Sequence, residues 1–266
     1  MSYIYKNIIV GATAEGLALA EELANNSNDT IVVSSNFIYG KKQIPGVEYH
    51  DAEAVYLQYS HGLFVLTVMR GVLKGTICGT NLILATGTKP IKTTLKNSNI
   101  CYKALDVPGR YKDQPVVVYG NTADAATYAL DLSKRFGYVY LCTKEFDLLC
   151  NQRLLKKIND KANIVHLPGC SIMACKNDKN GKLTEVTLDT YATITSSSLI
   201  FALGRLPDIP AFSKRYIELE NDGFLKVNEY NESTLVPGVF AIGELCKKYT
   251  KRDLKKLVEY LKSRRN

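Results

Sequence analysis

The sequence predicts an α/β protein with two Rossmann-like, three-layer nucleotide-binding domains, the second inserted into the first. A glycine turn occurs twice, as Gly11 to Gly16 and as Gly120 to Ala125, each time after an apolar β-branched run and before an Ala- and Leu-rich stretch. That strand–turn–helix context is the one that a dinucleotide site requires. Alternating apolar residues between the two copies predict antiparallel strands, and 266 residues suffice for two interleaved domains.

The first copy of the turn lies in a complete βαβ pattern from Tyr3 to Ser35. A helix is predicted from about Glu15 to Ala24, followed by a strand from Thr30 to Val33. Alternating apolar positions between residues 47 and 84 then predict an antiparallel meander.

The second copy lies in another βαβ pattern that begins at Pro115. Its helix is predicted across Ala123 to Phe136 and its second strand from Tyr138 to Cys142. A further helix and strand, a hairpin that turns at residues 177–181, and an apolar strand from Ser198 to Leu203 follow.

The order of these patterns sets the expected domain boundaries. One βαβ unit and its meander are followed by a second βαβ unit with its own meander, and then by a return segment. We therefore expect a discontinuous first domain, residues 1–109 plus 208–266, and an inserted second domain over residues 110–207.

The positive charge is concentrated at the carboxyl end. The net charge is +8, and nine Lys or Arg residues against Asp253 and Glu259 give the segment from Lys247 to Asn266 a charge of +7. Apolar residues at helical spacing predict an amphipathic helix there: Leu254, Leu257, Val258 and Leu261. We interpret it as a solvated terminal helix docked by these side chains. Contact with an acidic partner, nucleic acid or a membrane surface is the less favoured alternative.

Seven cysteines form neither a C-x-x-C pair nor a regular framework, which predicts a reducing, cytoplasmic environment and mostly packing roles. Cys170 and Cys175 are spaced so that they could pair or bind a metal, but packing is the favoured interpretation. The three histidines show no ligand spacing and no Ser/His/Asp arrangement is visible, so the sequence predicts no metal site and identifies no catalytic residue.

Four blocks occur in order over nearly the whole chain. They are the Gly11 turn; a strand that ends in Ala85-Thr86-Gly87; the Gly120 turn followed by Gly204-Arg205-Leu206-Pro207; and a segment that ends in Gly243-Glu244. Together they resemble the FAD-dependent pyridine nucleotide–disulfide oxidoreductases, specifically the thioredoxin reductase-like branch. The resemblance implies a flavoprotein oxidoreductase that binds FAD and NAD(P)H and forms a homodimer.

The resemblance places an FAD site in the first domain, with the contacts Gly11, Thr13, Gly16, Ser34, Thr86, Gly87, Gly243 and Glu244. Gly11 permits the tight bend and Gly16 permits close helix packing. Thr13 replaces the glycine that lets the backbone approach the diphosphate, and a β-branched residue disfavours positive φ. Its hydroxyl could instead donate to a phosphate at the helix N-terminus. The position of the expected acidic acceptor for the ribose falls on Ser34 or Ser35. In the alternative interpretation, the turn serves the backbone only.

A weaker NAD(P) site is implied in the second domain, with the contacts Gly120, Thr122, Ala125, Lys144, Glu145, Gly204 and Arg205. Glu145 suits a ribose diol and opposes a 2′-phosphate, whereas Lys144 has the opposite effect, so NADH is slightly favoured. The alternative, a surface loop of mixed charge, is preferred for Lys144 and Glu145.

The chain departs from the family at the redox dithiol. The stretch Tyr102-Lys103-Ala104-Leu105-Asp106 stands where relatives carry Tyr-Cys-x-x-Cys, so Lys103 and Asp106 occupy the two cysteine positions. Neither side chain exchanges disulfides, which argues against the usual dithiol relay. Glu244 is also longer than the family's aspartate beside the flavin.

Two functions follow from these observations. The first is a thioredoxin reductase-like flavoprotein that passes electrons between NAD(P)H and a non-dithiol acceptor through FAD, with a redox protein as a candidate partner. The alternative is a catalytically degenerate nucleotide-binding or scaffold protein of the same fold, which uses the basic helix for partner contact. The retained Ala-Thr-Gly, Gly-Arg-x-Pro and Gly-Glu blocks favour the first.

Overall fold

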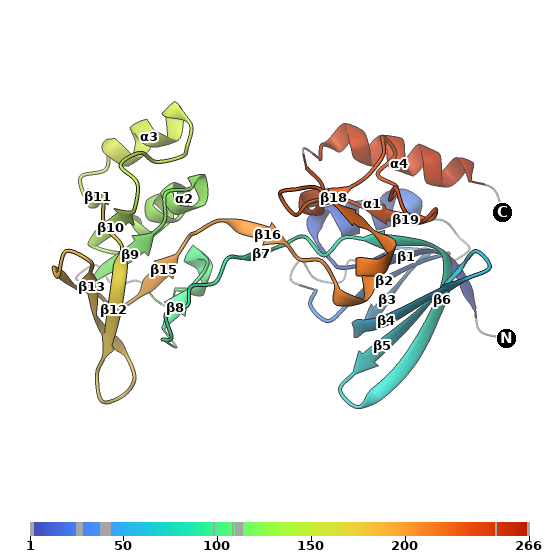
Figure 1. Ribbon diagram of the computed structural model, residues 1–266, viewed down its shortest axis with the longest axis horizontal. Coiled ribbons are helices and arrows are strands. Elements are labelled where there is room, and N and C mark those ends of the chain that lie inside the picture. Colours follow the sequence, from blue (N-terminus) through green and yellow to red (C-terminus); the bar gives the residue numbers. More distant parts are fainter. Residues whose placement is uncertain are drawn as a thin grey trace. The chain divides into compact units, whose positions relative to one another are not determined.

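A computed structural model describes residues 3–24, 29–37, 44–97, 99–107, 109, 114–247 and 249–264. The chain divides into two compact units (Figure 1). Unit 1 comprises Met1–Lys89 and Leu206–Asn266, and unit 2 comprises Pro90–Arg205. The second unit therefore lies, in the sequence, between two segments of the first.

The boundary between the units is earlier than the sequence predicted, because residues 90–109 belong to unit 2. The strand β8 (Ile100–Cys101) pairs in parallel with β15 (Leu199–Phe201). Ala104, in the short 3₁₀ helix η1 (Ala104–Asp106), packs in the unit 2 core, and its carbonyl accepts a hydrogen bond of 2.5 Å from Arg135. These contacts are between residues distant in sequence, which a pattern of apolar positions does not reveal.

Unit 1 contains a seven-stranded mixed sheet in the order β3-β2-β1-β6-β5-β4, with β19 paired to β6. The strands are β1 (Ile4–Val10), β2 (Thr30–Ser34), β3 (Val47–Asp51), β4 (Glu53–Ser60), β5 (Leu63–Arg70), β6 (Leu73–Leu84) and β19 (Val239–Ala241). The expected antiparallel meander is present as β4, β5 and β6. The segment Val47–Asp51 was wrongly included in it, because β3 pairs in parallel with β2.

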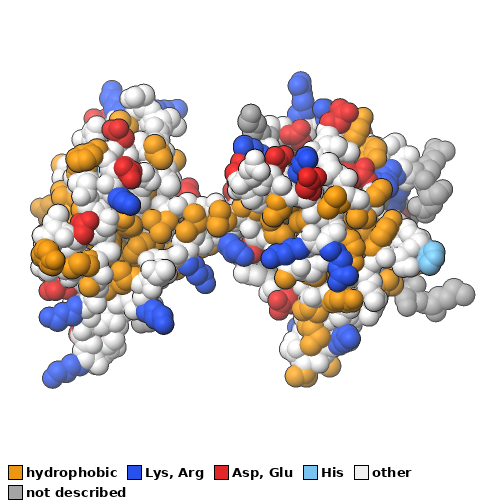
Figure 2. Space-filling view, viewed as in Figure 1, with side chains coloured by type: hydrophobic (Ala, Val, Ile, Leu, Met, Phe, Trp, Pro, Cys, Tyr) orange, Lys and Arg blue, Asp and Glu red, His pale blue; other side chains and the backbone are white. Residues whose placement is uncertain are grey.

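Two helices of unit 1 pack together on this sheet, α1 (Ala14–Leu23) and α4 (Lys251–Ser263). They share one hydrophobic cluster with Ile9 of β1 and Ile83 of β6. Leu257, Val258 and Leu261 are buried there, so α4 is docked by its apolar face. Basic side chains stand out from the surface over α4, next to acidic ones (Figure 2). Residues 248, 265 and 266 of the basic segment lie outside the described residues.

The two strands that contain the unit boundaries, β7 (Thr88–Pro90) and β16 (Arg205–Pro207), pair with each other. In unit 1, β17 (Glu218–Leu219) pairs with β18 (Leu225–Lys226). Two 3₁₀ helices are η2 (Ala211–Tyr216) and η3 (Gly243–Leu245). Within the described residues, no helix has the length and apolar character needed to cross a membrane.

Unit 2 contains a five-stranded parallel sheet in the order β11-β10-β9-β15-β8 and a three-stranded sheet β12-β13-β14. Its remaining elements are β9 (Pro115–Tyr119), α2 (Ala123–Leu132), β10 (Tyr138–Thr143), α3 (Gln152–Asn159), β11 (Ile164–Pro168), β12 (Ile172–Asn177), β13 (Leu183–Leu188) and β14 (Thr193–Thr195). The helix α2 ends at Leu132, earlier than the predicted Phe136, because the chain turns there to bury Phe136 in the unit 2 core before β10. Both units thus place a glycine turn at the carboxyl end of a parallel strand.

Candidate functional site

The glycines of the first turn are required by close packing. A Cβ atom on Gly11 would lie 2.3 Å from the Ala85 carbonyl oxygen, and Gly11 has φ of +106°. If the backbone did not move, a Cβ atom on Gly16 would lie 2.9 Å from the Ala85 Cβ and 2.8 Å from the Gly11 oxygen. Both distances are shorter than van der Waals contact, so glycine lets β1, α1 and the end of β6 approach one another.

Thr13 is the N-cap residue of α1. Its φ is −70° and its ψ is 168°, so the expectation that a positive φ would disfavour threonine here is wrong. The Oγ1 atom of Thr13 accepts a hydrogen bond of 3.2 Å from the Gly16 N–H. Among the described residues, the Thr13 hydroxyl donates to no acceptor. One donor therefore stays available at the helix N-terminus, where anions are favoured.

A cavity of about 500 Å³ lies beside this turn. Its lining includes Val10 and Gly11 at the end of β1, Ser34 at the end of β2, and Thr86 and Lys89 after β6. The carboxyl ends of parallel strands are where open α/β sheets bind ligands. The volume is within the range of small-molecule sites.

Three polar groups of the cavity lining also have structural partners. The Ser34 hydroxyl donates to the Asn36 oxygen at 2.8 Å and accepts from the Asn36 N–H at 3.1 Å. The Thr86 hydroxyl donates to the Asp208 oxygen at 2.6 Å. Lys89 forms an ion pair of 2.9 Å with Asp208, and both side chains are about half exposed. The Ser34 hydroxyl is therefore already bonded to Asn36, and serine has no carboxylate that could hold a ribose diol.

Further predicted residues meet at the N-terminal end of α1. A Cβ atom on Gly87 (φ +69°) would lie 3.0 Å from the Thr13 methyl carbon. A Cβ atom on Gly243 (φ +68°) would lie 3.3 Å from the Glu15 side chain. Glu244 is exposed and accepts a hydrogen bond from the Thr88 hydroxyl. Thr13, Gly87 and Gly243 thus surround one helix end.

Glu15 is a member of this site that sequence reasoning missed. The residue is partly buried in the first turn of α1, where a carboxylate interacts favourably with the helix dipole. Within the described part of the chain, it makes no hydrogen bond or ion pair. An acidic residue between the first and third turn glycines was the available signal. A carboxylate here opposes a bound diphosphate.

The second turn repeats the packing and differs in its hydroxyl. A Cβ atom on Gly120 (φ +145°) would lie 2.1 Å from the Ala202 oxygen. Thr122 caps α2 with φ of −84°, and its Oγ1 atom accepts from the Ala125 N–H at 3.3 Å. The Thr122 hydroxyl also donates to the Ala202 oxygen at 3.1 Å. Both hydrogen-bonding functions of Thr122 are thus used within unit 2.

Of the other predicted residues of the second site, Gly204 lies beside the Gly120 turn, because a Cβ atom on it would lie 4.0 Å from the Thr122 methyl carbon. Lys144 and Glu145 are exposed in the loop after β10, where the Glu145 carbonyl accepts from the buried Thr143 hydroxyl at 2.7 Å. Gly204 has φ of +97°, which favours glycine, and Arg205 begins β16.

All seven cysteines are free thiols. Cys101 lies close to the position of the family's dithiol, and burial, with the nearby Asp106, raises the pKa of its thiol. A raised pKa lowers the thiolate fraction, and with it the reactivity. Cys170 is buried and Cys175 partly buried, and among the described residues no group of three or more potential metal ligands is assembled.

Comparison with known proteins identifies the family. The model of the pyridine nucleotide-disulphide oxidoreductases matches residues 5–258, and the chain belongs to this family. It is 24% identical over 284 residues to the thioredoxin reductase of Mycoplasmopsis pulmonis, covering 91% of this chain and 89% of that protein. It is 22% identical over 284 residues to that of Ureaplasma parvum, covering 92% and 90%.

Solved structures show the same fold. The thioredoxin reductase of Lactococcus lactis superposes with a TM-score of 0.78 at 15% identity, covering 97% of this chain and 98% of that one. The bacillithiol disulfide reductase of Bacillus cereus superposes with a TM-score of 0.76 at 15% identity, covering 99% and 100%. The predicted α/β fold and thioredoxin reductase-like family are therefore confirmed. Membership in this oxidoreductase family implies FAD and NAD(P)H as cofactors.

Proposed function

We propose that this protein is a thioredoxin reductase-like flavoprotein that passes electrons between NAD(P)H and an acceptor other than a C-x-x-C dithiol. FAD, when bound, supplies the electron-transfer chemistry. The adenosine and diphosphate end of FAD would occupy the cavity beside the Gly11 turn. The chain's own residues would bind and orient the nucleotide there.

The observation that carries this proposal is the 500 Å³ cavity at the first turn together with the Thr13 hydroxyl, which has no acceptor among the described residues. A phosphate oxygen is an acceptor suited to that hydroxyl and to the first N–H groups of α1. The side chains of the cavity wall add no net positive charge, because Lys89 is paired with Asp208 and the exposed Glu53 also lines the cavity. The groups of unit 1 that suit the anionic end of the cofactor are therefore the Thr13 hydroxyl and the helix N-terminus.

Lys103 and Asp106 support the proposed acceptor. In η1 the N–H of Asp106 donates to the carbonyl of Lys103 at 3.1 Å, and neither residue carries a sulfur atom. Cys101 is a single, partly buried thiol with a raised pKa. A small molecule or a redox protein with its own redox centre therefore suits this chain better than a dithiol relay. We further propose a cytoplasmic homodimer that uses NADH in preference to NADPH, with Glu145 facing the ribose.

Glu15 favours a second candidate function. Its carboxylate is partly buried beside Gly243, has no hydrogen-bond or ion-pair partner in the part of the chain that the structure describes, and opposes a diphosphate at the same helix end. On this alternative the fold binds a nucleotide weakly or not at all and serves as a scaffold, with the exposed basic face of α4 as a contact surface.

The visible absorbance spectrum of the purified protein distinguishes the two functions. We expect a flavin band after incubation with FAD and gel filtration, and we expect NADH to bleach it under anaerobic conditions. A protein that retains FAD without bleaching would support the nucleotide-binding alternative. A protein that retains no FAD would overturn the flavoprotein proposal.

A further inference from the structure

A second cavity of unit 1, of about 290 Å³, lies away from the Gly11 turn. Its lining includes Lys6 on β1, Asn81 on β6, Gly62 in the turn between β4 and β5, and Arg264 after α4. Lys6 precedes Val10 on β1, and Asn81 precedes Leu84 on β6, so the cavity lies toward the amino-terminal side of these parallel strands. No residue of this cavity belongs to the proposed nucleotide site.

Lys6 contributes an uncompensated positive charge. Its side chain is partly buried, and its ammonium forms no hydrogen bond or ion pair with any described residue. An anion bound in the cavity would gain a charge-assisted hydrogen bond from this ammonium group.

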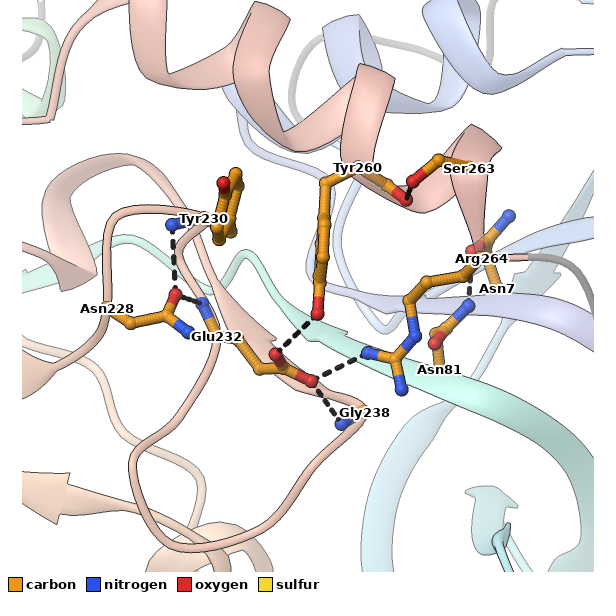
Figure 3. Close-up of polar contacts among 9 residues, drawn as sticks. All are labelled: Asn7, Asn81, Asn228, Tyr230, Glu232, Gly238, Tyr260, Ser263 and Arg264. Atoms are coloured by element: carbon orange, nitrogen blue, oxygen red, sulfur yellow. Dashed lines mark hydrogen bonds and ion pairs between the residues drawn. The ribbon is translucent and has the colours of Figure 1, made fainter.

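Arg264 contributes a second cation, whose carboxylate partner is shared. Its Nη1 atom lies 2.6 Å from an oxygen of Glu232, a residue that is only 8% exposed. The same carboxylate accepts hydrogen bonds from the Gly238 N–H at 2.8 Å and from the Tyr260 hydroxyl at 3.1 Å (Figure 3). Glu232 thus balances one cation, and Lys6 stays in excess.

Asn81 supplies a fixed polar group on the cavity wall. It is 3% exposed, and its Nδ2 atom donates to the Asn7 oxygen at 3.1 Å, while Asn7 donates to the Thr30 hydroxyl at 3.2 Å. This row of buried amides holds the Asn81 side chain in one orientation. Figure 3 shows Asn7, Asn81 and Arg264 in the same region of unit 1.

We propose that this cavity binds a small oxyanion, either inorganic phosphate or the phosphate or carboxylate group of a small metabolite. Two cations line the cavity, one of them without a partner among the described residues, and they match the charge of such a group. The volume, at the lower end of ligand sites, suits a small ion or one end of a larger molecule. A bound anion would join β1 to the residue that follows α4, and would stabilise the docked helix by mass action.

Isothermal titration with sodium phosphate and with sodium acetate, at ionic strength matched with chloride, tests the proposal. We expect phosphate or acetate to bind, and Lys6→Met to weaken binding at least ~10-fold because one charge-assisted contact is lost. The exposed Lys74→Met is the matched control and should bind as the original protein does. Binding of phosphate alone assigns a phosphoryl ligand, and binding of both assigns a general oxyanion site.

A further variant separates this cavity from the Gly11 turn. Thr13→Asp keeps an N-cap residue on α1 and places a negative charge at the proposed diphosphate site. Phosphate binding that persists in Thr13→Asp and is weakened in Lys6→Met supports the proposal. Binding that is unchanged in Lys6→Met overturns it, as does absence of binding of both anions. Circular dichroism checks the fold, and if Lys6→Met is unfolded, Lys6→Gln provides the same comparison.

Discussion

The two glycine turns of this chain share the same kinds of packing and helix cap, and they differ in the hydrogen bonding of one threonine hydroxyl. Gly11 and Gly120 both lie against a carbonyl of a neighbouring strand end, and Thr13 and Thr122 both cap the following helix. The Thr122 hydroxyl donates to the Ala202 oxygen, whereas the Thr13 hydroxyl donates to no described residue. The same turn sequence therefore gives the same close packing in both units. Among the described residues, it leaves the threonine hydroxyl without an acceptor in unit 1 and with one in unit 2.

The largest effect is expected where this packing is closest. Gly11→Ala places a Cβ atom 2.3 Å from the Ala85 oxygen, and Gly120→Ala places one 2.1 Å from the Ala202 oxygen. Both glycines have a positive φ, which favours glycine. We expect each substitution to lower the free energy of unfolding by about 3 kcal/mol or more. Gly181→Ala is the control, since φ is +79° and nothing lies within 4 Å; it should cost about 1 kcal/mol. Urea unfolding measures all three, and equal losses would contradict the packing argument.

The hydroxyl difference predicts unequal effects on FAD. Thr13→Val removes the free donor, and we expect it to weaken FAD binding ~10-fold. Thr122→Val, the matched change in unit 2, should leave FAD binding unchanged. Each variant also loses a helix cap, which costs about 1 kcal/mol in stability. Fluorescence titration with FAD compares the two, and an equal loss of affinity would place the cofactor elsewhere.

Removing the charge of Glu15 should strengthen FAD binding at the first turn, whereas removing the Thr13 hydroxyl should weaken it. Neutralising its carboxylate removes a negative charge beside Gly243, so Glu15→Gln should tighten FAD binding by roughly 5-fold, most clearly at low salt. Glu22→Gln, further along α1, is the control and should have little effect. Riboflavin, which has no diphosphate, should bind the original protein and Glu15→Gln alike. Unchanged FAD affinity in Glu15→Gln would remove the electrostatic argument for the weak-binding alternative.

The smallest expected effect is on the pH dependence of the free energy of unfolding, through His166 of unit 2. Burial lowers the pKa of His166 in the folded protein, so the unfolded chain binds a proton more readily. The stability contributed by neutral His166 is fully present above the ordinary pKa of the unfolded side chain, and it is lost as the pH falls from that value through the lower pKa of the folded state. We expect His166→Gln to flatten slightly the decline in unfolding free energy between about pH 7 and 5. Urea unfolding at several pH values tests this, and an unchanged slope would contradict it.

Much of the fold could be predicted because local pattern and tertiary structure agree. The apolar runs of β1 and β9 and the spacing in α4 place their residues in the cores as expected. The segment Val47–Asp51 was misassigned because its alternation fits parallel and antiparallel strands equally. The end of α2 was missed because burial of Phe136, not helix propensity, sets it.

The candidate sites were less accessible to sequence reasoning. The sequence predicted a tight bend at Gly11 and Gly120 and close helix packing at Gly16, since a tight turn after a strand restricts the residue type; the close approach of Gly11 and Gly120 to neighbouring carbonyl groups was not predicted. The availability of the Thr13 hydroxyl, the position of Glu15 against Gly243, and the meeting of Lys6 with Arg264 were not visible. Each depends on residues brought together from distant segments.

The sequence by itself determined the family, the two strand–turn–helix units and the absence of a C-x-x-C dithiol, because these depend on residue type and local spacing. Only the tertiary structure decided which threonine hydroxyl has a partner, where the second unit begins, and which cations share a cavity. Hydrogen bonds and charge pairs act over a few ångströms in space. Their partners are set by strand pairing and helix docking, and not by distance along the chain.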